Sequence, residues 1–101
     1  MTNYNNPTHD LGHIIALVKQ GRYRVTTVAL KGAAALGLDL DGMLATVLAL
    51  PSEGKFYKTM ESNQSPGNWM DVYHTRTPTG DDVYLKLMLQ NGVLIVSFKE
   101  L

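Results

Sequence analysis

The chain has 101 residues, of which 45% are hydrophobic and 18% charged, so one domain over residues 1–101 with a modest core is expected and a disordered chain is excluded. Lysine and arginine together number nine, as do aspartate and glutamate, so a nucleic-acid site would have to be a local patch. The chain contains no cysteine, which excludes disulfides and thiolate metal sites. It has no signal-peptide pattern and no apolar run that could cross a bilayer, so we expect a cytoplasmic protein.

Three helices are predicted in the first half, after a polar arm over residues 1–8. An apolar stripe over 11–18 has helical spacing, and an alanine-rich helix follows over 29–37. A third stripe runs from Leu40 to Leu48, with Pro51 just past its end. RYRVTT, at 22–27, has room for a short extended segment. The predicted N-caps are Thr8 or Asp10, then Thr26 or Thr27, and Asp39.

Four strands are predicted in the second half, where the apolar pattern changes to alternation. Asn91-Gly92 lies between the last two strands and predicts a tight hairpin. Helices followed by strands indicate an α+β fold, with the N-terminal helices packed on an antiparallel sheet. The strands are KFYKTMES (55–62), NWMDVYHT (68–75), VYLKLMLQ (83–90) and VLIVSFKE (93–100), with turns at SPG (65–67) and TPTGD (77–81).

Alternation predicts which strand residues share a face. In 83–90 the alternate residues Val83, Leu85, Leu87 and Leu89 face the core, which leaves Tyr84 and Lys86 on the open face. In the first strand, Phe56 shares a face with Lys58 and Met60. In 93–100, Leu94, Val96 and Phe98 lie on one face and Lys99 lies on the other. Burying a lysine without a carboxylate partner is costly, so the lysines are assigned to the open face. The cluster expected there is Lys58, His74, Arg76, Tyr84, Lys86 and Lys99.

Such a cluster suits RNA, because cations hold phosphates while Phe56 or Met60 offers a flat or soft surface to a base. A simpler reading is that lysines on exposed strands only discourage edge pairing. No metal-ligand spacing, phosphate-binding glycine loop or serine-hydrolase motif is present, and His9, His13 and His74 are scattered.

Five motifs together resemble the MqsR family, the ribonuclease toxins of bacterial toxin–antitoxin pairs. They are GLDLDGM (37–43), FYKTM (56–60), WMDVY (69–73), VYLKL (83–87) and VLIVSFKE (93–100), with a looser fit at GRYRVTT (21–27). The resemblance implies a RelE/YoeB-like fold and a metal-independent endoribonuclease, without cofactor, that cuts messenger RNA at GCU-like sites. It also implies an MqsA-like antitoxin that holds the zinc of the system, neutralises the toxin and represses the operon. Contact of the toxin with operator DNA would then be only indirect, through the antitoxin.

The resemblance also carries residue roles to this chain. The family's catalytic lysine and tyrosine match Lys58 and Tyr84, and the lysine of VSFKE matches Lys99. Where the family has glutamine in WQDVY, this chain has Met70, which can pack against a base but donates no hydrogen bond. Where the family often has arginine after DVY, this chain has His74, with Arg76 two positions further on.

A metal-free ribonuclease can use the RNA 2′-hydroxyl as nucleophile, with a base, an acid and cations around the phosphate. Lys58 is expected to act as base or as fixed charge, and Tyr84 as proton shuttle or orienting group, with His74 as the alternative acid. Arg76, Lys86 and Lys99 would hold phosphate, and Met60 and Met70 would contact bases. Two alternatives stay open: a binding module weakened in catalysis by Met70, and a toxin that cuts only on the ribosome.

Overall fold

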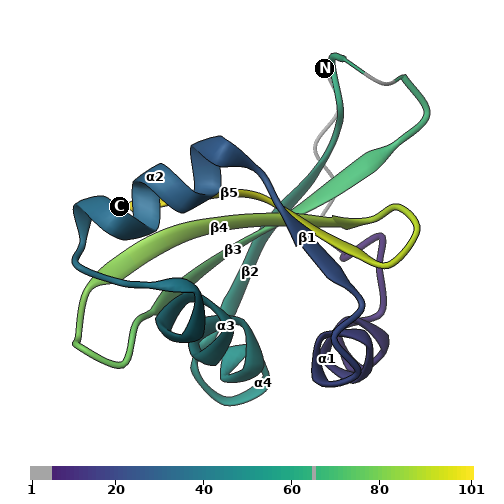
Figure 1. The fold of residues 1–101 in the computed structure, drawn as a ribbon. Coiled ribbons are helices and arrows are strands. Elements are labelled where there is room, and N and C mark those ends of the chain that lie inside the picture. The colour runs from purple at the N-terminus through teal and green to yellow at the C-terminus, as the bar shows by residue number, and fades with distance from the viewer. Residues whose placement is uncertain (1–5, 65) are drawn as a thin grey trace.

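Apart from one short strand, helices occupy the first half of the chain and strands the second in this computed structural model (Figure 1). The structure describes residues 6–64 and 66–101. This confirms the predicted α+β class, while residues 1–5 of the predicted arm and Ser65 of the predicted turn lie outside the described residues. The elements are α1 (Leu11–Lys19), β1 (Tyr23–Val25), α2 (Thr27–Ala35), α3 (Leu40–Leu48), α4 (Leu50–Glu53), β2 (Lys55–Glu61), β3 (Trp69–Arg76), β4 (Asp82–Leu89) and β5 (Val93–Glu100).

The five strands form one mixed sheet in the order β1-β5-β4-β3-β2. Neighbours from β2 to β5 are antiparallel, and Asn91 and Gly92 turn the last hairpin with φ of 54° and 103°, as the sequence predicted. The four predicted strands are antiparallel as expected, but the sheet as a whole is mixed, because the short strand β1 joins it in parallel with the start of β5. The reason is that β1 is followed by helices and not by a hairpin, and such a crossover permits parallel pairing.

The helix ends follow the predicted capping signals. The Thr26 side chain accepts a hydrogen bond from the Ala29 N–H, and the Asp39 carboxylate accepts one from the Gly42 N–H. Asp10 is the N-cap of α1, although its side chain makes no capping bond. Pro51 lies past α3, as predicted, but it also sits in the first turn of the short helix α4, where proline is tolerated.

The hydrophobic core lies between the helices and one face of the sheet. Side chains from all four helices meet the aliphatic set of β4 together with Tyr73, Val93, Ile95 and Phe98. Helix α2 lies beside β5 in Figure 1, and a Cβ added at Gly32 would come within 1.7 Å of the Phe98 carbonyl oxygen. None of the helices in the described part of the chain is long and apolar enough to cross a membrane.

Two β-bulges change the faces that simple alternation predicts. In β2 the register steps from Phe56 opposite Tyr73 to Lys58 opposite Val72, so Tyr57 is the extra residue. Phe56 therefore packs on the core, with its ring centre 5.6 Å from that of Tyr73. The prediction that Phe56 shares a face with Lys58 is wrong for this reason.

The second bulge lies in β5, opposite the step from Lys86 to Leu87, and makes Val96 the extra residue. Val93, Ile95 and Phe98 consequently all belong to the core. The predicted grouping of Phe98 with Leu94 and Val96 is therefore wrong, whereas the placement of Lys99 on the open face is confirmed, since its ammonium lies over Tyr84.

Candidate active site

The sheet face opposite the helices carries most of the residues that the sequence singled out. We call it the lysine face, because Lys58, Lys86 and Lys99 reach it from three different strands. Its central members are Lys55, Tyr57, Lys58 and Met60 of β2, Met70, Val72 and His74 of β3, Tyr84, Lys86 and Met88 of β4, and Leu94, Ser97 and Lys99 of β5.

A row of rings crosses this face and ends at a lysine. The rings of Tyr57 and His74 stack, with centres 4.3 Å apart and planes 22° apart. The His74 ring lies 6.2 Å from that of Tyr84, its partner across β3 and β4. The Lys99 Nζ lies 4.8 Å from the centre of the Tyr84 ring. The row can offer flat surfaces to bases beside a cation for a phosphate.

A second row runs parallel to the first and contains the other two lysines. Lys58 lies opposite Val72 on one side, and Lys86 lies opposite Val72 on the other side and Ser97 beyond. Val72 is fully buried, yet it is not part of the helix-side core. The aliphatic stems of both lysines flank it, which explains how this polar face excludes water from a valine.

Desolvation and like charge change the titration of two residues on this face. Burial lowers the pKa of Lys86, and the ammonium groups of Lys99 and Lys58 lower it further. Burial also raises the pKa of Tyr84, with a smaller contribution from Tyr57. Among residues 6–64 and 66–101 the one salt bridge joins Arg76 and Asp82, so no carboxylate there neutralises the three lysines.

The methionines form an apolar end to the lysine face. Met60 is half-buried and lies opposite Met70 in the β2–β3 pairing. Met70 is only 7% exposed and Met88 only 5%. Met60 therefore presents more surface to a base than Met70 does.

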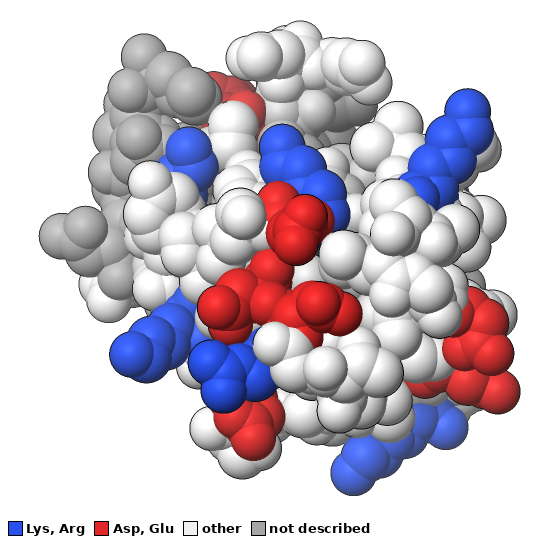
Figure 2. Space-filling model, turned by 90° about the vertical axis from the view of Figure 1, so that its left-hand side faces the viewer, with Lys and Arg blue, Asp and Glu red and all other residues white. Residues whose placement is uncertain are grey.

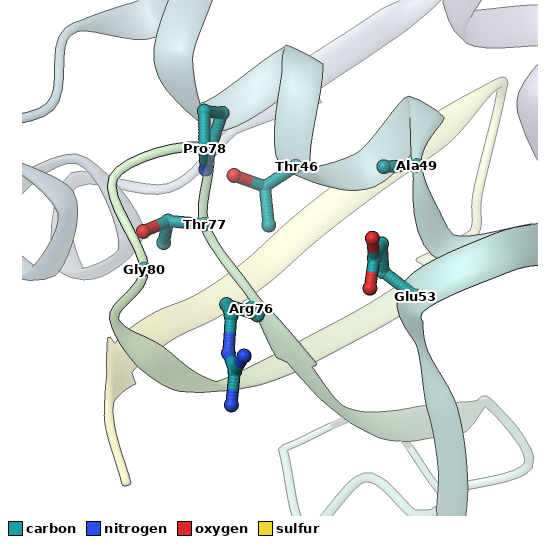
Figure 3. Close-up of a pocket in the computed structure, with 7 residues that line it drawn as sticks. All are labelled: Thr46, Ala49, Glu53, Arg76, Thr77, Pro78 and Gly80. Carbon is teal, nitrogen blue, oxygen red and sulfur yellow. The ribbon is translucent and has the colours of Figure 1, made fainter.

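Arg76 is on the same strand as His74 but lies away from the three lysines, at the end of β3. Its Nε lies 3.3 Å from the Asp82 carboxylate, and both side chains are 63% exposed. Arg76 and Glu53 line two adjoining hollows of about 410 and 340 Å³, the second of which also touches His74. Figure 3 shows the Glu53 carboxylate pointing into the larger hollow and the Arg76 guanidinium pointing away from it.

The side of the molecule that holds the β3–β4 turn and the C-terminus carries charges of both signs. Figure 2 shows acidic side chains gathered at its centre, with basic ones mostly around them. Since carboxylates repel a polyanion, this side is less suited to RNA than the lysine face.

His9 and Asp71 have a role that the sequence did not indicate. The buried Asp71 carboxylate accepts hydrogen bonds from the backbone N–H groups of Thr8, at 3.0 Å, and His9, at 2.8 Å. The His9 ring bonds the Trp69 carbonyl oxygen, and Thr8 bonds Thr59. These contacts fix the start of the described chain against β2 and β3 on the helix side, so His9 is not part of the lysine face.

Asp71 also acts on its neighbour in the core. Burial raises the pKa of Tyr73 to about 12, and the negative charges of Asp71 and Asp10 contribute less. Nowhere in the described ranges do three His, Asp or Glu side chains gather as metal ligands would.

Sequence reasoning missed Lys55, Tyr57, Val72 and Ser97 as members of the face. Tyr57 reaches it only because of the bulge in β2, which alternation cannot reveal. Val72 and Ser97 share the parity of His74 and Lys99, so their positions could have been found, but neither residue type suggests a site.

These features define an α+β protein whose cationic sheet face suits a phosphodiester, and comparison with known proteins gives its family. The chain matches the family described as "Motility quorum-sensing regulator, toxin of MqsA" over residues 6–100 and belongs to this MqsR toxin family. It is 46% identical over 94 residues to the mRNA interferase toxin MqsR of Escherichia coli strain K12, covering 93% of this chain and 94% of that protein. The resemblance in the five motifs is thus confirmed.

Proposed function

We propose that the protein is an mRNA interferase, the toxin of a type II toxin–antitoxin pair, and that it cleaves messenger RNA on the lysine face. The observation that carries this proposal is that Lys86 and Lys99 lie over the Tyr84 ring and Lys58 over the neighbouring Tyr57 ring, with no carboxylate in a salt bridge to any of the three in the described chain. Uncompensated cations next to aromatic rings suit RNA backbone and bases, and membership of the MqsR family supports the same substrate.

Cleavage proceeds by attack of the RNA 2′-hydroxyl on the adjacent phosphorus. Lys99 and Lys58 stabilise the charge that develops on the phosphate oxygens, and Tyr84 moves or orients a proton. Lys58 is also a candidate for the base, and His74 is the alternative acid. Lys86 and Arg76 bind further phosphates of the RNA strand. Arg76 can form two hydrogen bonds to one phosphate when its ion pair with Asp82 is broken.

Bases of the RNA pack on the side chains that border the lysines. Tyr57 and His74 offer stacked rings at one end, and Met60, with the exposed edge of Met70, offers a soft surface at the other. We propose a GCU-like cleavage preference on the strength of the family resemblance.

The proposal includes a partner and a location. An MqsA-like antitoxin neutralises the toxin in the cytoplasm, and the toxin meets operator DNA only through that antitoxin. The family description, which names MqsA, supports the choice of partner.

Mapping the RNA ends in the presence of EDTA tests this function. We expect the purified protein to cut naked messenger RNA in EDTA and to leave a 2′,3′-cyclic phosphate and a 5′-hydroxyl, because the nucleophile belongs to the RNA. A strict requirement for a divalent cation contradicts the proposal, and cutting that needs added ribosomes favours the ribosome-dependent alternative.

A weakened binding module is the second candidate, and Met70 is the observation that favours it. Methionine cannot donate the hydrogen bond that the family glutamine offers, and its side chain is nearly buried. Induction of the gene distinguishes the two, since an active toxin arrests growth until the antitoxin is supplied, whereas a binding module does not.

A further inference from the structure

The geometry around Lys86 singles it out from the other two lysines of the face. Lys86 lies on β4, between Val72 of β3 and Ser97 of β5, so both neighbouring strands flank its side chain. Lys58 is on the edge strand β2, and Lys99 is exposed. The Lys86 stem is thus the one held on both sides while its ammonium group remains at the surface.

Tyr84 lies two residues before Lys86, on the same face of β4. The Lys86 Nζ is 5.7 Å from the centre of the Tyr84 ring, and the Lys99 Nζ is 4.8 Å from it. A phosphodiester bound over this ring would have an amine near one of its ester oxygens and a phenol near the other. In-line displacement places the attacking and leaving oxygens on opposite sides of phosphorus, which requires two separate groups of this kind.

The groups that face Lys86 come from every neighbouring strand of the lysine face. The titratable groups are Lys55, Tyr57 and Lys58 of β2, His74 of β3, Tyr84 of β4 and Lys99 of β5. The carboxylate of this face, Asp82, lies four residues before Lys86 and is paired with Arg76, so an ammonium at Lys86 meets the like charges of Lys58 and Lys99 and no adjacent counter-charge. This environment favours the neutral amine.

We propose that Lys86 is the general base that takes the proton of the 2′-hydroxyl and that Tyr84 is the general acid, with Lys58 and Lys99 as fixed positive charges. This inference rests on the proposed function and assigns the proton transfers that it leaves open. It assigns the base to a lysine first given only phosphate binding, in place of Lys58, which the resemblance matches to the family's catalytic lysine.

The titration directions support the same assignment. The pKa of Lys86 is lowered from the ordinary 10.5 and that of Tyr84 is raised from the ordinary 10.0. At a given pH below 10.5, more of Lys86 is therefore neutral than in an ordinary lysine. Tyr84 keeps its proton to a higher pH than an ordinary tyrosine does. Environments that separate two pKa values in this way mark a base and an acid.

The proton and bond balance of the step is complete. The Lys86 amine accepts the 2′-hydroxyl proton as the 2′-oxygen forms a bond to phosphorus. The bond from phosphorus to the 5′-oxygen breaks, and the Tyr84 phenol donates its proton to that leaving oxygen. The products are a 2′,3′-cyclic phosphate and a 5′-hydroxyl, and the Lys86 ammonium returns its proton to the Tyr84 phenolate directly or through solvent.

The pH dependence of cleavage provides the first test, using wild type, Lys86→Met and Lys86→Arg. The methionine keeps the stem beside Val72, and the arginine keeps the charge but does not titrate. We expect both variants to lose about 100- to 10,000-fold in rate. The wild-type cleavage rate should rise with pH up to the pKa of Lys86. The rising limb of this pH–rate profile should be absent in Lys86→Arg.

Lys58→Arg and Lys99→Arg are the matched comparisons, because they preserve the fixed charges. Even where their rates fall, they should keep the wild-type pH profile. Circular dichroism and thermal melting verify that each variant is folded. Lys86→Arg with a rate within tenfold of wild type and an unchanged limb would overturn the assignment.

A substrate with a 5′-bridging sulfur distinguishes base from acid, since a thiolate leaves without protonation. We expect the defect of Lys86→Met to persist on this substrate and that of Tyr84→Phe to shrink. The opposite pattern would show that Lys86 is the acid. If wild type cleaves RNA but these results fail, only this inference is lost, whereas absence of wild-type cleavage removes the proposed function.

Discussion

At the scale of single residues, the need to cover the buried Val72 explains why β2 carries Lys58 in an otherwise largely apolar segment. Lys58 and Lys86 stand on either side of the buried Val72, so their stems contribute to packing while their ammonium groups stay at the surface. The same face desolvates Lys86 and Tyr84 enough to change both pKa values. Lys86 thus packs beside Val72 through its stem while its ammonium group is partly desolvated.

Asp71 allows a prediction at this scale about stability. Asp71→Asn places an amide NH₂ where one oxygen accepts an N–H from the backbone, so one of the bonds to Thr8 and His9 is lost. We expect the free energy of unfolding to fall by about 1–3 kcal/mol in urea denaturation. Asp82→Asn, which breaks only the exposed pair with Arg76, should cost under about 1 kcal/mol. Equal losses in the two variants would contradict this role for Asp71.

At the scale of elements, helices and strands were predictable, and the faces of two strands were not. The caps at Thr26 and Asp39 and the turn at Asn91-Gly92 have local chemistry that determines their conformation. The bulges at Tyr57 and Val96 have no such local signal, because pairing with neighbouring strands determines them. The lysines were placed correctly because a lysine avoids burial, whereas Phe56 was placed on the wrong face.

The contact between α2 and β5 allows a prediction for the elements. Gly32→Ala would put a Cβ 1.7 Å from the Phe98 carbonyl oxygen, so α2 must move away from β5. We expect a loss of about 1–3 kcal/mol in unfolding free energy, measured by thermal or urea denaturation.

Gly12→Ala is the matched control within a helix. Its added Cβ would meet nothing closer than the Asp10 carboxylate at 3.7 Å, so α1 should keep or gain stability. A Gly32→Ala variant as stable as Gly12→Ala would contradict the close packing of α2 on β5.

At the scale of the whole molecule, the protein has no net charge and concentrates its cations locally. Lysine and arginine equal aspartate and glutamate in number, so long-range attraction to RNA is small. In the proposed function with Lys86 as the base, Lys58 and Lys99 of the lysine face, with Arg76 at the end of β3, provide the local attraction to phosphate. The bulk charge of the sequence could not reveal this arrangement, since only the pairing of β2 to β5 brings the lysines together.

The salt dependence of RNA cleavage tests this local attraction. Each phosphate neutralised on a single strand contributes a slope of about −0.7 to log kcat/KM against log salt. With up to three cations engaged (Lys58, Lys99 and Arg76), we expect a slope of roughly −2. Lys99→Met should reduce its magnitude by about 0.7, while Lys31→Met, on the exposed side of α2, should leave it unchanged. A slope near zero in the wild type would contradict binding through the lysine face.

The most direct measurement compares wild type and Lys58→Met on naked messenger RNA in EDTA, because the central claim is that cleavage takes place on the lysine face. Methionine keeps the stem beside Val72 and removes the charge, so folding should be preserved. We predict an unchanged melting temperature and a cleavage rate that is lower by about 100-fold or more. A folded Lys58→Met protein that cuts at the wild-type rate would contradict the account.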